Sequence, residues 1–189
     1  MDPEKIVISG ESGGGYVTMA TMVLLAQRGE SHLVRAAIPI IPMISDYFFG
    51  EAESMTLEER QTKENVGINT LIGNSFFLSN VCFEQGMEMF WKYIAKDIKA
   101  QWSDPLLFPA KASDELIQKM PATVIISAEF DIFITETERM ARRMRQNGRL
   151  LEFCCLPGIT HGAYVRPDIG AYRAFHDAFK LIISEYVKQ

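Results

Sequence analysis

Residues 5–16 read K-I-V-I-S-G-E-S-G-G-G-Y, and this stretch decides how the rest of the chain is interpreted. A short β-favouring apolar run, Ile6 to Ile8, leads into a glycine-rich turn, and an apolar segment of helical length follows. The turn has the pattern G-x-S-x-G, in which glycine neighbours let a serine sit at a strained strand-to-helix elbow with its hydroxyl projecting. The pattern predicts that Ser12 is a nucleophile.

A phosphate-binding loop is the main alternative for this turn, because glycine-rich turns after strands also bind phosphate or let a helix pack closely. Such a loop ends in Lys followed by Ser or Thr, whereas Tyr16 and Val17 stand there in this chain. A buried-type strand before the turn and a helix directly after it are what a nucleophile elbow requires. The nucleophile interpretation is therefore favoured.

The composition indicates one globular domain that is not attracted to nucleic acid. The chain has 189 residues, 48% of them hydrophobic, and a formal net charge of −5. Arginines cluster at residues 139–149, but they fall on a helix whose other face is apolar, so a solvated surface is expected. The longest apolar run, residues 36–44, is short and contains prolines, so we expect no membrane span.

The three cysteines lack the spacing of a disulfide framework or of a zinc site. Cys154 and Cys155 are adjacent in a strand-like run, so they point to opposite faces and cannot bridge each other. Met1 is followed by Asp-Pro-Glu rather than by a basic and then an apolar segment. We expect a cytoplasmic protein that uses no cofactor and no metal.

Continuous apolar strands alternate with helices, which predicts an α/β fold with a mostly parallel sheet and helices on both faces. Strands are expected at residues 5–9, 36–41, 123–128 and 150–156, and helices at 16–27, from 134 to the Asn-Gly pair at 147–148, and at 169–187. Pro39 is expected to push its strand toward a bulge or an edge.

Residues 45–104 are too long for a connection in a parallel sheet. They are expected to form a helical cap, inserted within a single domain that spans residues 1–189. The methionine and aromatic residues of the insertion either line an apolar pocket or simply pack onto the domain.

Three residues with complementary chemistry directly follow predicted strands: Ser12, Asp131 and His161. Functional groups gather at the carboxyl ends of the strands in open α/β sheets. The order nucleophile, acid, histidine is that of the α/β-hydrolases. The histidine would remove the serine proton, and the aspartate would fix the histidine tautomer and stabilise its cation.

Two other histidines and two other acids compete for these roles. His32 precedes the second strand, at the opposite end of the sheet, and His176 lies on the flank of the last helix. Glu129 and Glu136 are near the predicted acid, where either is solvated or pairs with the arginines. Asp131 is favoured because it stands just beyond the strand end.

Several stretches of the chain carry a family resemblance. G-E-S-G-G-G at 10–15 is similar to G-D-S-A-G-G, A-E-F-D-I-F-I-T-E at 128–136 to A-E-x-D-P-L-R-D-E, and H-G-A-Y at 161–164 to H-G-F. W-K-Y-I at 91–94 and S-D-P-L-L-F-P at 103–109 are similar to a run between cap and seventh strand. These motifs belong to the hormone-sensitive-lipase-like esterases, the alpha/beta hydrolase fold-3 enzymes, and the resemblance covers essentially the whole chain.

The resemblance implies a serine carboxylesterase or lipase that acts on short to medium acyl or aryl esters, with the N–H of Gly13 donating to the oxyanion. Ile132 and Thr135 replace the proline and aspartate of the motif, and Ala163 replaces its aromatic residue, which bears on substrate fit. No H-G-G occurs, although that loop supplies further oxyanion donors in the family. The alternative is a catalytically impaired hydrolase that acts as a ligand-binding or interaction module.

The strand at Lys5 to Ser9 resembles the fifth strand of the family, which is interior in the family's sheet. Here the first four strands would be missing, so this apolar strand would be an uncovered edge that invites pairing. Three explanations stay open: a fragment of a longer gene product, a truncated gene model, or a chain whose edge is covered by a partner such as a second copy in a homodimer.

Overall fold

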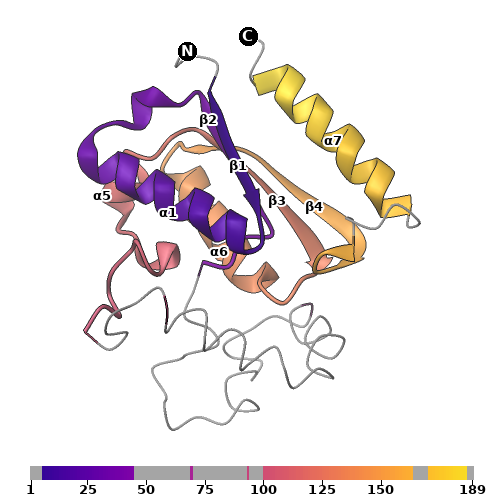
Figure 1. Ribbon diagram of the computed structural model, residues 1–189, viewed down its shortest axis with the longest axis horizontal. Helices are drawn as coiled ribbons and strands as arrows, with labels where there is room; N and C mark the ends of the chain where they lie inside the picture. Colours follow the sequence, from indigo (N-terminus) through magenta and orange to yellow (C-terminus); the bar gives the residue numbers. More distant parts are fainter. Residues whose placement is uncertain (1–5, 45–68, 70–92, 94–99, 164–169, 187–189) are drawn as a thin grey trace, which may run out of the picture.

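The structure is a computed structural model that describes residues 6–44, 69, 93, 100–163 and 170–186. These residues form a parallel sheet of four strands with helices on both faces, which confirms the predicted fold class (Figure 1). The strands are β1 (Val7–Glu11), β2 (Ala36–Ile40), β3 (Thr123–Phe130) and β4 (Leu150–Thr160). The helices are α1 (Gly13–Arg28), α5 (Asp114–Ile117), α6 (Ile134–Gln146) and α7 (Gly170–Tyr186), with short 3-10 turns η2 (Ser31–Leu33) and η3 (Pro109–Lys111).

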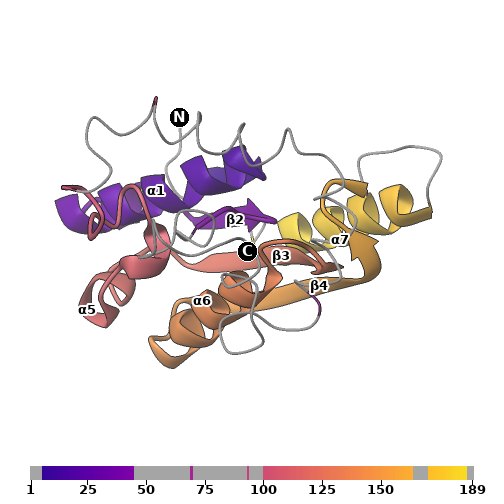
Figure 2. The same cartoon turned by 90° about the horizontal axis from the view of Figure 1, so that it is seen from below.

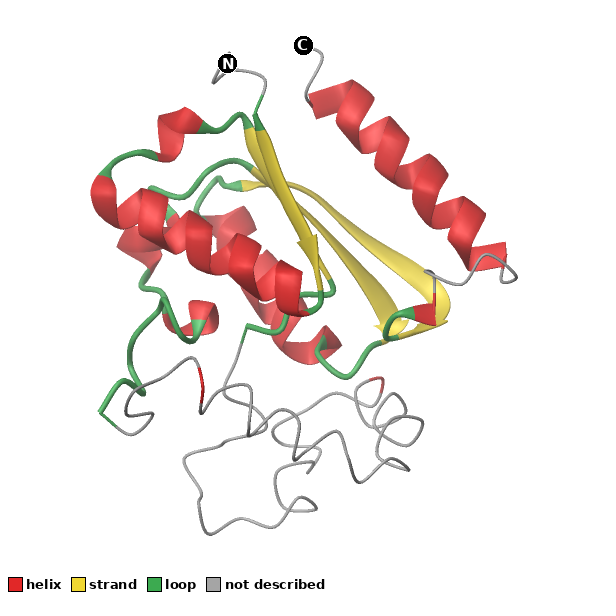
Figure 3. Ribbon diagram, in the orientation of Figure 1, coloured by secondary structure: helices red, strands yellow, loops and turns green. Residues whose placement is uncertain are grey.

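The predicted cap at residues 45–104 lies almost wholly outside the described residues. The described strands follow the order β1-β2-β3-β4, and every neighbouring pair is parallel. All the arrows in Figure 3 therefore point toward the same end of the sheet. The turns that follow these strands therefore lie together at the carboxyl ends of the strands, where the predicted functional residues stand.

β2 lies inside the sheet, between β1 and β3, and is buried along its whole length. The prediction that Pro39 pushes this strand toward an edge or a bulge is therefore wrong. The N–H groups of Ala37 and Ile41 donate to the carbonyls of Ala122 and Ile126, so the missing N–H of Pro39 would face β3 as well. The proline removes one bond of that ladder, while the pairing of β2 with β1 continues through it.

β4 continues to Thr160, beyond its predicted end at Leu156. Its pairing with β3 is interrupted, because Ala128 pairs with Leu156 whereas Phe130 pairs with Thr160. Gly158 has a φ of 69°, a conformation that glycine adopts without strain. The strand therefore bulges around Gly158 and resumes pairing directly before the histidine that follows it.

Helices α1, α5 and α6 cover one face of the sheet, and α7 covers the other (Figures 1 and 2). The first face is rich in methionine, and its buried residues include Met19, Met22, Ala37, Ile117, Ile125, Met140 and Met144. On the second face, Phe175 and Ile182 of α7 pack against Ile38, Ile40, Val124 and Ile126. Side chains of β2 and β3 alternate between the two cores, as expected for strands covered on both sides.

Helix α1 is capped by Gly29, just beyond the predicted end of the helix at residue 27. This glycine has a left-handed φ of 71°, and its N–H donates to the carbonyl of Ala26. Only part of the surface of α1 is buried. Met19 and Met22 are fully buried, but Val17 is 57% exposed, so one strip of the helix lies outside the core.

Arg143 joins α6 to the segment around α5. Its guanidinium donates to the carbonyls of Ala110 and Ala112 at 2.9 and 2.5 Å and to the carboxylate of Asp114 at 2.7 Å. The planar fork of five donors is suited to several acceptors at once. The arginine-rich face of α6 is therefore not only solvated, as expected from the sequence, but also holds a neighbouring segment.

Candidate active site

Ser12 stands at a sharp turn between β1 and α1. Its φ of 54° and ψ of −111° form a conformation that a residue other than glycine keeps only when its surroundings hold it. Its N–H donates to the carbonyl of Ile40 at the end of β2 at 3.0 Å, and its own carbonyl accepts from the N–H of Tyr16 at 2.9 Å. Backbone bonds on both sides therefore fix the elbow that the sequence predicted.

Close backbone packing around this elbow requires two glycines. A Cβ on Gly10 would lie 2.4 Å from the carbonyl oxygen of Gly14, and a Cβ on Gly15 would lie 2.7 Å from that of Ile40. A Cβ on Gly13 or Gly14 would meet no atom within 4 Å. Gly10, the first glycine of G-x-S-x-G, therefore cannot carry a side chain without a clash, whereas Gly14, the last glycine of the pattern, could. The other glycine that cannot carry a side chain is Gly15, which lies outside the pattern.

The structure brings Ser12, His161 and Asp131 together in one hydrogen-bonded chain. The Oγ of Ser12 lies 2.9 Å from Nε2 of His161, and Nδ1 of His161 lies 2.8 Å from Oδ2 of Asp131. Ser12 directly follows β1, Asp131 directly follows β3, and His161 directly follows β4. An ionised carboxylate only accepts, so Nδ1 carries the imidazole proton and Nε2 is free to accept from the serine hydroxyl.

The Asp131 carboxylate is completely buried and has a partner on each oxygen. Its side chain is 0% exposed, against 10% for His161. Oδ1 accepts the N–H of Phe133 at 2.8 Å, while Oδ2 faces the imidazole. A buried charge is tolerated when it is hydrogen-bonded in this way. The carboxylate therefore has a fixed orientation toward His161.

The competing acids have other partners. Glu136 pairs with Arg139 at 2.6 Å. The carboxylate of Glu129 accepts the N–H of Gly158 at 2.7 Å and so bridges β3 to the bulge of β4. No sequence pattern indicates this bridge, because the bulge that exposes the N–H of Gly158 depends on the register between two distant strands.

The other two histidines lie at other places in the fold. His32 is in the exposed turn η2 before β2. As predicted, this turn lies at the amino ends of the strands, opposite the carboxyl ends where Ser12, Asp131 and His161 stand. His176 lies in α7, with ring centroids 4.2 Å from Tyr172 and 5.4 Å from Phe175. Its surroundings are those of a packing residue on a helix flank.

Cys154 and Cys155 are free thiols with raised pKa values. For Cys155 the pKa is raised first by partial burial and then by the carboxylates of Glu138, Glu129 and Asp131. Burial is also the main cause at Cys154. A protonated thiol is a weak nucleophile, so these residues do not compete with the serine.

Tyr16 ties the helix that follows the elbow to the segment before η3. Its hydroxyl donates to the carbonyl of Leu106 at 3.0 Å. Burial, and to a lesser extent the carboxylate of Asp104, raise the pKa of Tyr16 above its usual value. The hydroxyl therefore stays protonated, as a donor must.

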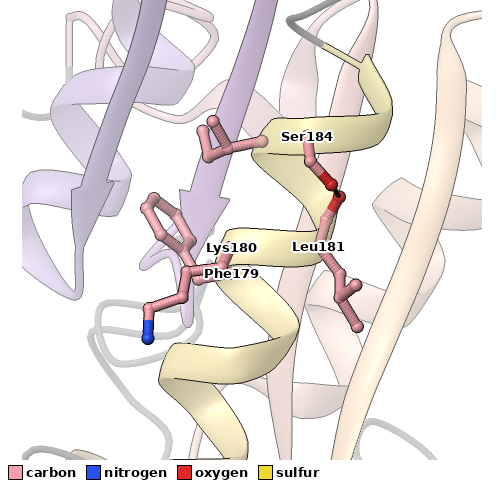
Figure 4. A pocket seen from close by; sticks show the side chains of 5 residues that line it. Phe179, Lys180, Leu181 and Ser184 are labelled. Carbon is pink, nitrogen blue, oxygen red and sulfur yellow. Dashed lines mark hydrogen bonds between the residues drawn. The ribbon is translucent and has the colours of Figure 1, made fainter.

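A shallow hollow runs along α7, away from the hydrogen-bonded chain (Figure 4). It is lined by Phe179, Lys180, Leu181, Ile183 and Ser184, which all belong to one helix. Leu181 is 69% exposed, and the hydroxyl of Ser184 donates to the carbonyl of Leu181 at 2.8 Å. With its one hydroxyl bonded to the helix itself, this hollow offers no convergent set of polar groups.

Within the described ranges, no three histidine, cysteine or acidic side chains gather closely enough to hold a metal ion. Among the helices that the structure describes, none combines the length and the apolar character needed to cross a bilayer.

Comparison with known proteins supplies the family. The profile of the family described as "alpha/beta hydrolase fold" matches residues 1–165. The chain belongs to the alpha/beta hydrolase fold family. This result confirms the resemblance seen in the motifs, and the parallel sheet of the hydrolase-fold chain agrees with it.

Individual relatives of this hydrolase-fold chain are distant in sequence. The human protein arylacetamide deacetylase-like 4 is 21% identical, over 100% of this chain and 55% of its own length. The structure of brefeldin A esterase, a bacterial homologue of human hormone-sensitive lipase, has a TM-score of 0.75 at 22% identity, over 98% of this chain and 48% of its own. A fungal esterase structure from Rhizomucor miehei has a TM-score of 0.73 at 15% identity, and the match covers 99% of this chain and 53% of the fungal one. The chain thus spans about half the length of these relatives.

Proposed function

We propose that this alpha/beta hydrolase is a serine hydrolase of the carboxylesterase or lipase type. The observation that carries the proposal is the chain of hydrogen bonds from Ser12 Oγ through His161 to Asp131, at 2.9 and 2.8 Å. Serine is a weak nucleophile unless an adjacent base removes its proton, and a histidine needs a carboxylate to hold its tautomer. The family membership and the presence of esterases among its structural neighbours support the same reaction class.

In the proposed reaction, Ser12 Oγ attacks the ester carbonyl carbon while its proton passes to Nε2 of His161. Asp131 stabilises the resulting imidazolium, which then gives the proton to the leaving alcohol as the carbonyl–oxygen bond breaks. Water, deprotonated by the same histidine, next attacks the acyl-serine. The bond to Oγ breaks, the acid leaves and the serine recovers its proton.

Gly13 is proposed as a donor to the oxyanion. Its N–H belongs to the first turn of α1, where backbone N–H groups have no carbonyl acceptor within the helix. It follows the proposed nucleophile directly, as the second oxyanion donor does in α/β-hydrolases. One missing donor typically costs about 3–4 kcal/mol of transition-state stabilisation, so this group contributes strongly to the rate.

The proposed substrates are small-molecule esters with short to medium acyl or aryl groups. This part of the proposal depends on residues 45–104 forming the cap of a single domain, which stays a prediction. The cytoplasmic location also stays a proposal, and the free thiols of Cys154 and Cys155 support it.

Turnover of a p-nitrophenyl ester series, from acetate to octanoate, tests the proposal. The purified chain is expected to hydrolyse the shorter esters, and Ser12→Ala is expected to lower kcat by at least about a thousandfold. Thr21→Ala serves as a control, since its hydroxyl donates to the Val17 carbonyl on α1 at 2.7 Å. Equal turnover by the wild type and by Ser12→Ala would contradict the proposal.

A second candidate function, an interaction module, is favoured by the position of β1. β1 is an outer strand of the described sheet. The N–H of Ser12 and the carbonyl of Ile6 bond to the β2 side, so by alternation the backbone groups of Val7 and Ser9 face outward. Two copies of such an outer strand can pair with each other around a two-fold axis. We therefore propose that β1 pairs with the β1 strand of a second copy of this chain.

The solution mass of Ser9→Pro tests this homodimer. The substitution removes an outward N–H, and it also removes the Ser9 hydroxyl that donates to the carbonyl of Ile38 on β2 at 2.8 Å. Ser9→Ala, which loses only the hydroxyl, is therefore the matched control. We expect a dimer for the wild type by light scattering and a monomer for Ser9→Pro. A monomeric wild type would refute the interaction through β1.

A further inference from the structure

We propose that Phe133 is a positioning residue that holds both His161 and Asp131 in their hydrogen-bonded geometry. The inference rests on the proposed function, because it assigns a role within that same site. Phe133 contacts each of the two groups with a different part of its structure. Its backbone N–H donates to Oδ1 of Asp131 at 2.8 Å, and its ring lies 5.3 Å from the imidazole, centroid to centroid.

The ring contact is an edge-to-face contact that limits how the imidazole can turn. The planes of the Phe133 and His161 rings are inclined by 84°. T-shaped pairs at this distance are favourable, whereas rotation of the imidazole about its Cβ–Cγ bond would break the arrangement. Since Nε2 must face Ser12 while Nδ1 faces Asp131, this one rotation controls both hydrogen bonds.

Phe133 is itself firmly held. Its carbonyl accepts two bonds from Thr137, one from the backbone N–H at 3.0 Å and one from Oγ1 at 2.9 Å. Thr137 is completely buried, and Phe133 is 5% exposed. A ring fixed in this way at the start of α6 can serve as a rigid stop for the histidine.

The sequence supports a role particular to this chain. In the motif A-E-x-D-P-L-R-D-E a leucine stands at the place of Phe133, and in H-G-F an aromatic stands at the place of Ala163. At these two motif positions, this chain thus carries an aromatic residue two places after its acid and an alanine two places after its histidine. Phe133→Leu keeps the backbone donor and an apolar side chain that the motif itself contains, and it removes the ring.

Two measurements on the full chain test the inference. The first is the proton NMR signal of the His161 Nδ1–H, assigned with His161→Gln, which reports the bond to Asp131 whether or not the protein is active. The second is the rate of modification by a fluorophosphonate, together with kcat and KM for p-nitrophenyl butyrate. Phe108→Leu is the matched control, because Phe108 is equally buried and its ring packs against Trp102.

For Phe133→Leu we expect an Nδ1–H signal that exchanges faster with solvent. The modification rate and kcat should fall about 2- to 10-fold, the range that an aromatic pair supports, with KM unchanged. Thr137→Val should change the same quantities in the same direction but less. Phe108→Leu should lower the melting temperature and leave these readouts unchanged.

An Nδ1–H signal in Phe133→Leu identical to the wild type would overturn the role of Phe133. The role would also be overturned if Phe133→Leu lowered the modification rate and kcat no more than Phe108→Leu does. If instead the wild type reacts with no fluorophosphonate, the proposed function fails, while the NMR comparison still decides whether Phe133 holds the histidine.

Discussion

Replacing the neighbouring glycines Gly14 and Gly15 by alanine should change stability in opposite directions. Both lie in the first turn of α1, so the gain in helix propensity is similar, at most about 1 kcal/mol. A Cβ on Gly14 would meet no atom within 4 Å. Gly14→Ala should therefore raise the free energy of unfolding by about 0.5–1 kcal/mol.

Gly15→Ala meets backbone that cannot rotate away. Its Cβ would lie 2.7 Å from the carbonyl oxygen of Ile40 and 2.9 Å from Cα of Pro42. The same carbonyl accepts the N–H of Ser12, so relieving the overlap displaces the elbow. Overpacking of this kind costs about 1–3 kcal/mol. After the gain in propensity, a net loss of up to about 2.5 kcal/mol remains.

Urea denaturation followed by circular dichroism measures both variants under the same conditions. The unfolding free energies of Gly14→Ala and Gly15→Ala should differ by about 1–3 kcal/mol, the cost of overpacking, with m-values equal to that of the wild type. If Gly15→Ala were as stable as Gly14→Ala, the close approach of α1 to the end of β2 would be wrong, and with it the account of how the elbow is fixed.

Further predictions concern charge and hydrogen bonding. Arg143→Met should lower the free energy of unfolding in urea by about 1–2 kcal/mol, because two backbone carbonyls lose their donor, and the exposed Arg142→Met should change it by less than about 0.5 kcal/mol. The raised pKa of Tyr16 makes its folded form favour the neutral phenol, so stability present below the unfolded value is lost as pH rises past about 10. Tyr16→Phe should be less stable by about 1 kcal/mol at neutral pH, because the carbonyl of Leu106 loses its donor, and should show a smaller alkaline loss in pH-dependent melts. Asp131→Asn should lower kcat for aryl esters by about 10⁴-fold through the wrong histidine tautomer, and activity within tenfold of wild type would contradict this.

The core of the site could be predicted because its chemistry is local to strand ends. Ser12, Asp131 and His161 each follow a recognisable apolar strand, and parallel strands bring their carboxyl ends to one edge. The serine elbow also has a local pattern, and its first glycine, Gly10, is needed because an added Cβ would lie 2.4 Å from the carbonyl oxygen of Gly14. These signals can be seen without knowledge of any long-range contact.

The features that sequence reasoning missed depend on pairing between distant segments. Pro39 lies in an interior strand at the loss of one bond of the ladder to β3, while the pairing with β1 continues, and no local pattern shows this. The bulge of β4 at Gly158, and the carboxylate of Glu129 that bonds to it, follow from the register with β3. The contact of Phe133 with His161 likewise joins two turns that only the folded sheet brings together.

The most direct test of the central claim is the intact mass of the folded chain after incubation with a fluorophosphonate, beside Ser12→Ala. We expect a single adduct on the wild type, formed at Ser12, and none on the variant. The hydrogen bonds from Ser12 to His161 and from His161 to Asp131 let Nε2 take the serine proton, so we expect this modification to be fast. No adduct on folded wild-type protein, or an adduct that persists in Ser12→Ala, would contradict the claim that these three residues form a working nucleophile.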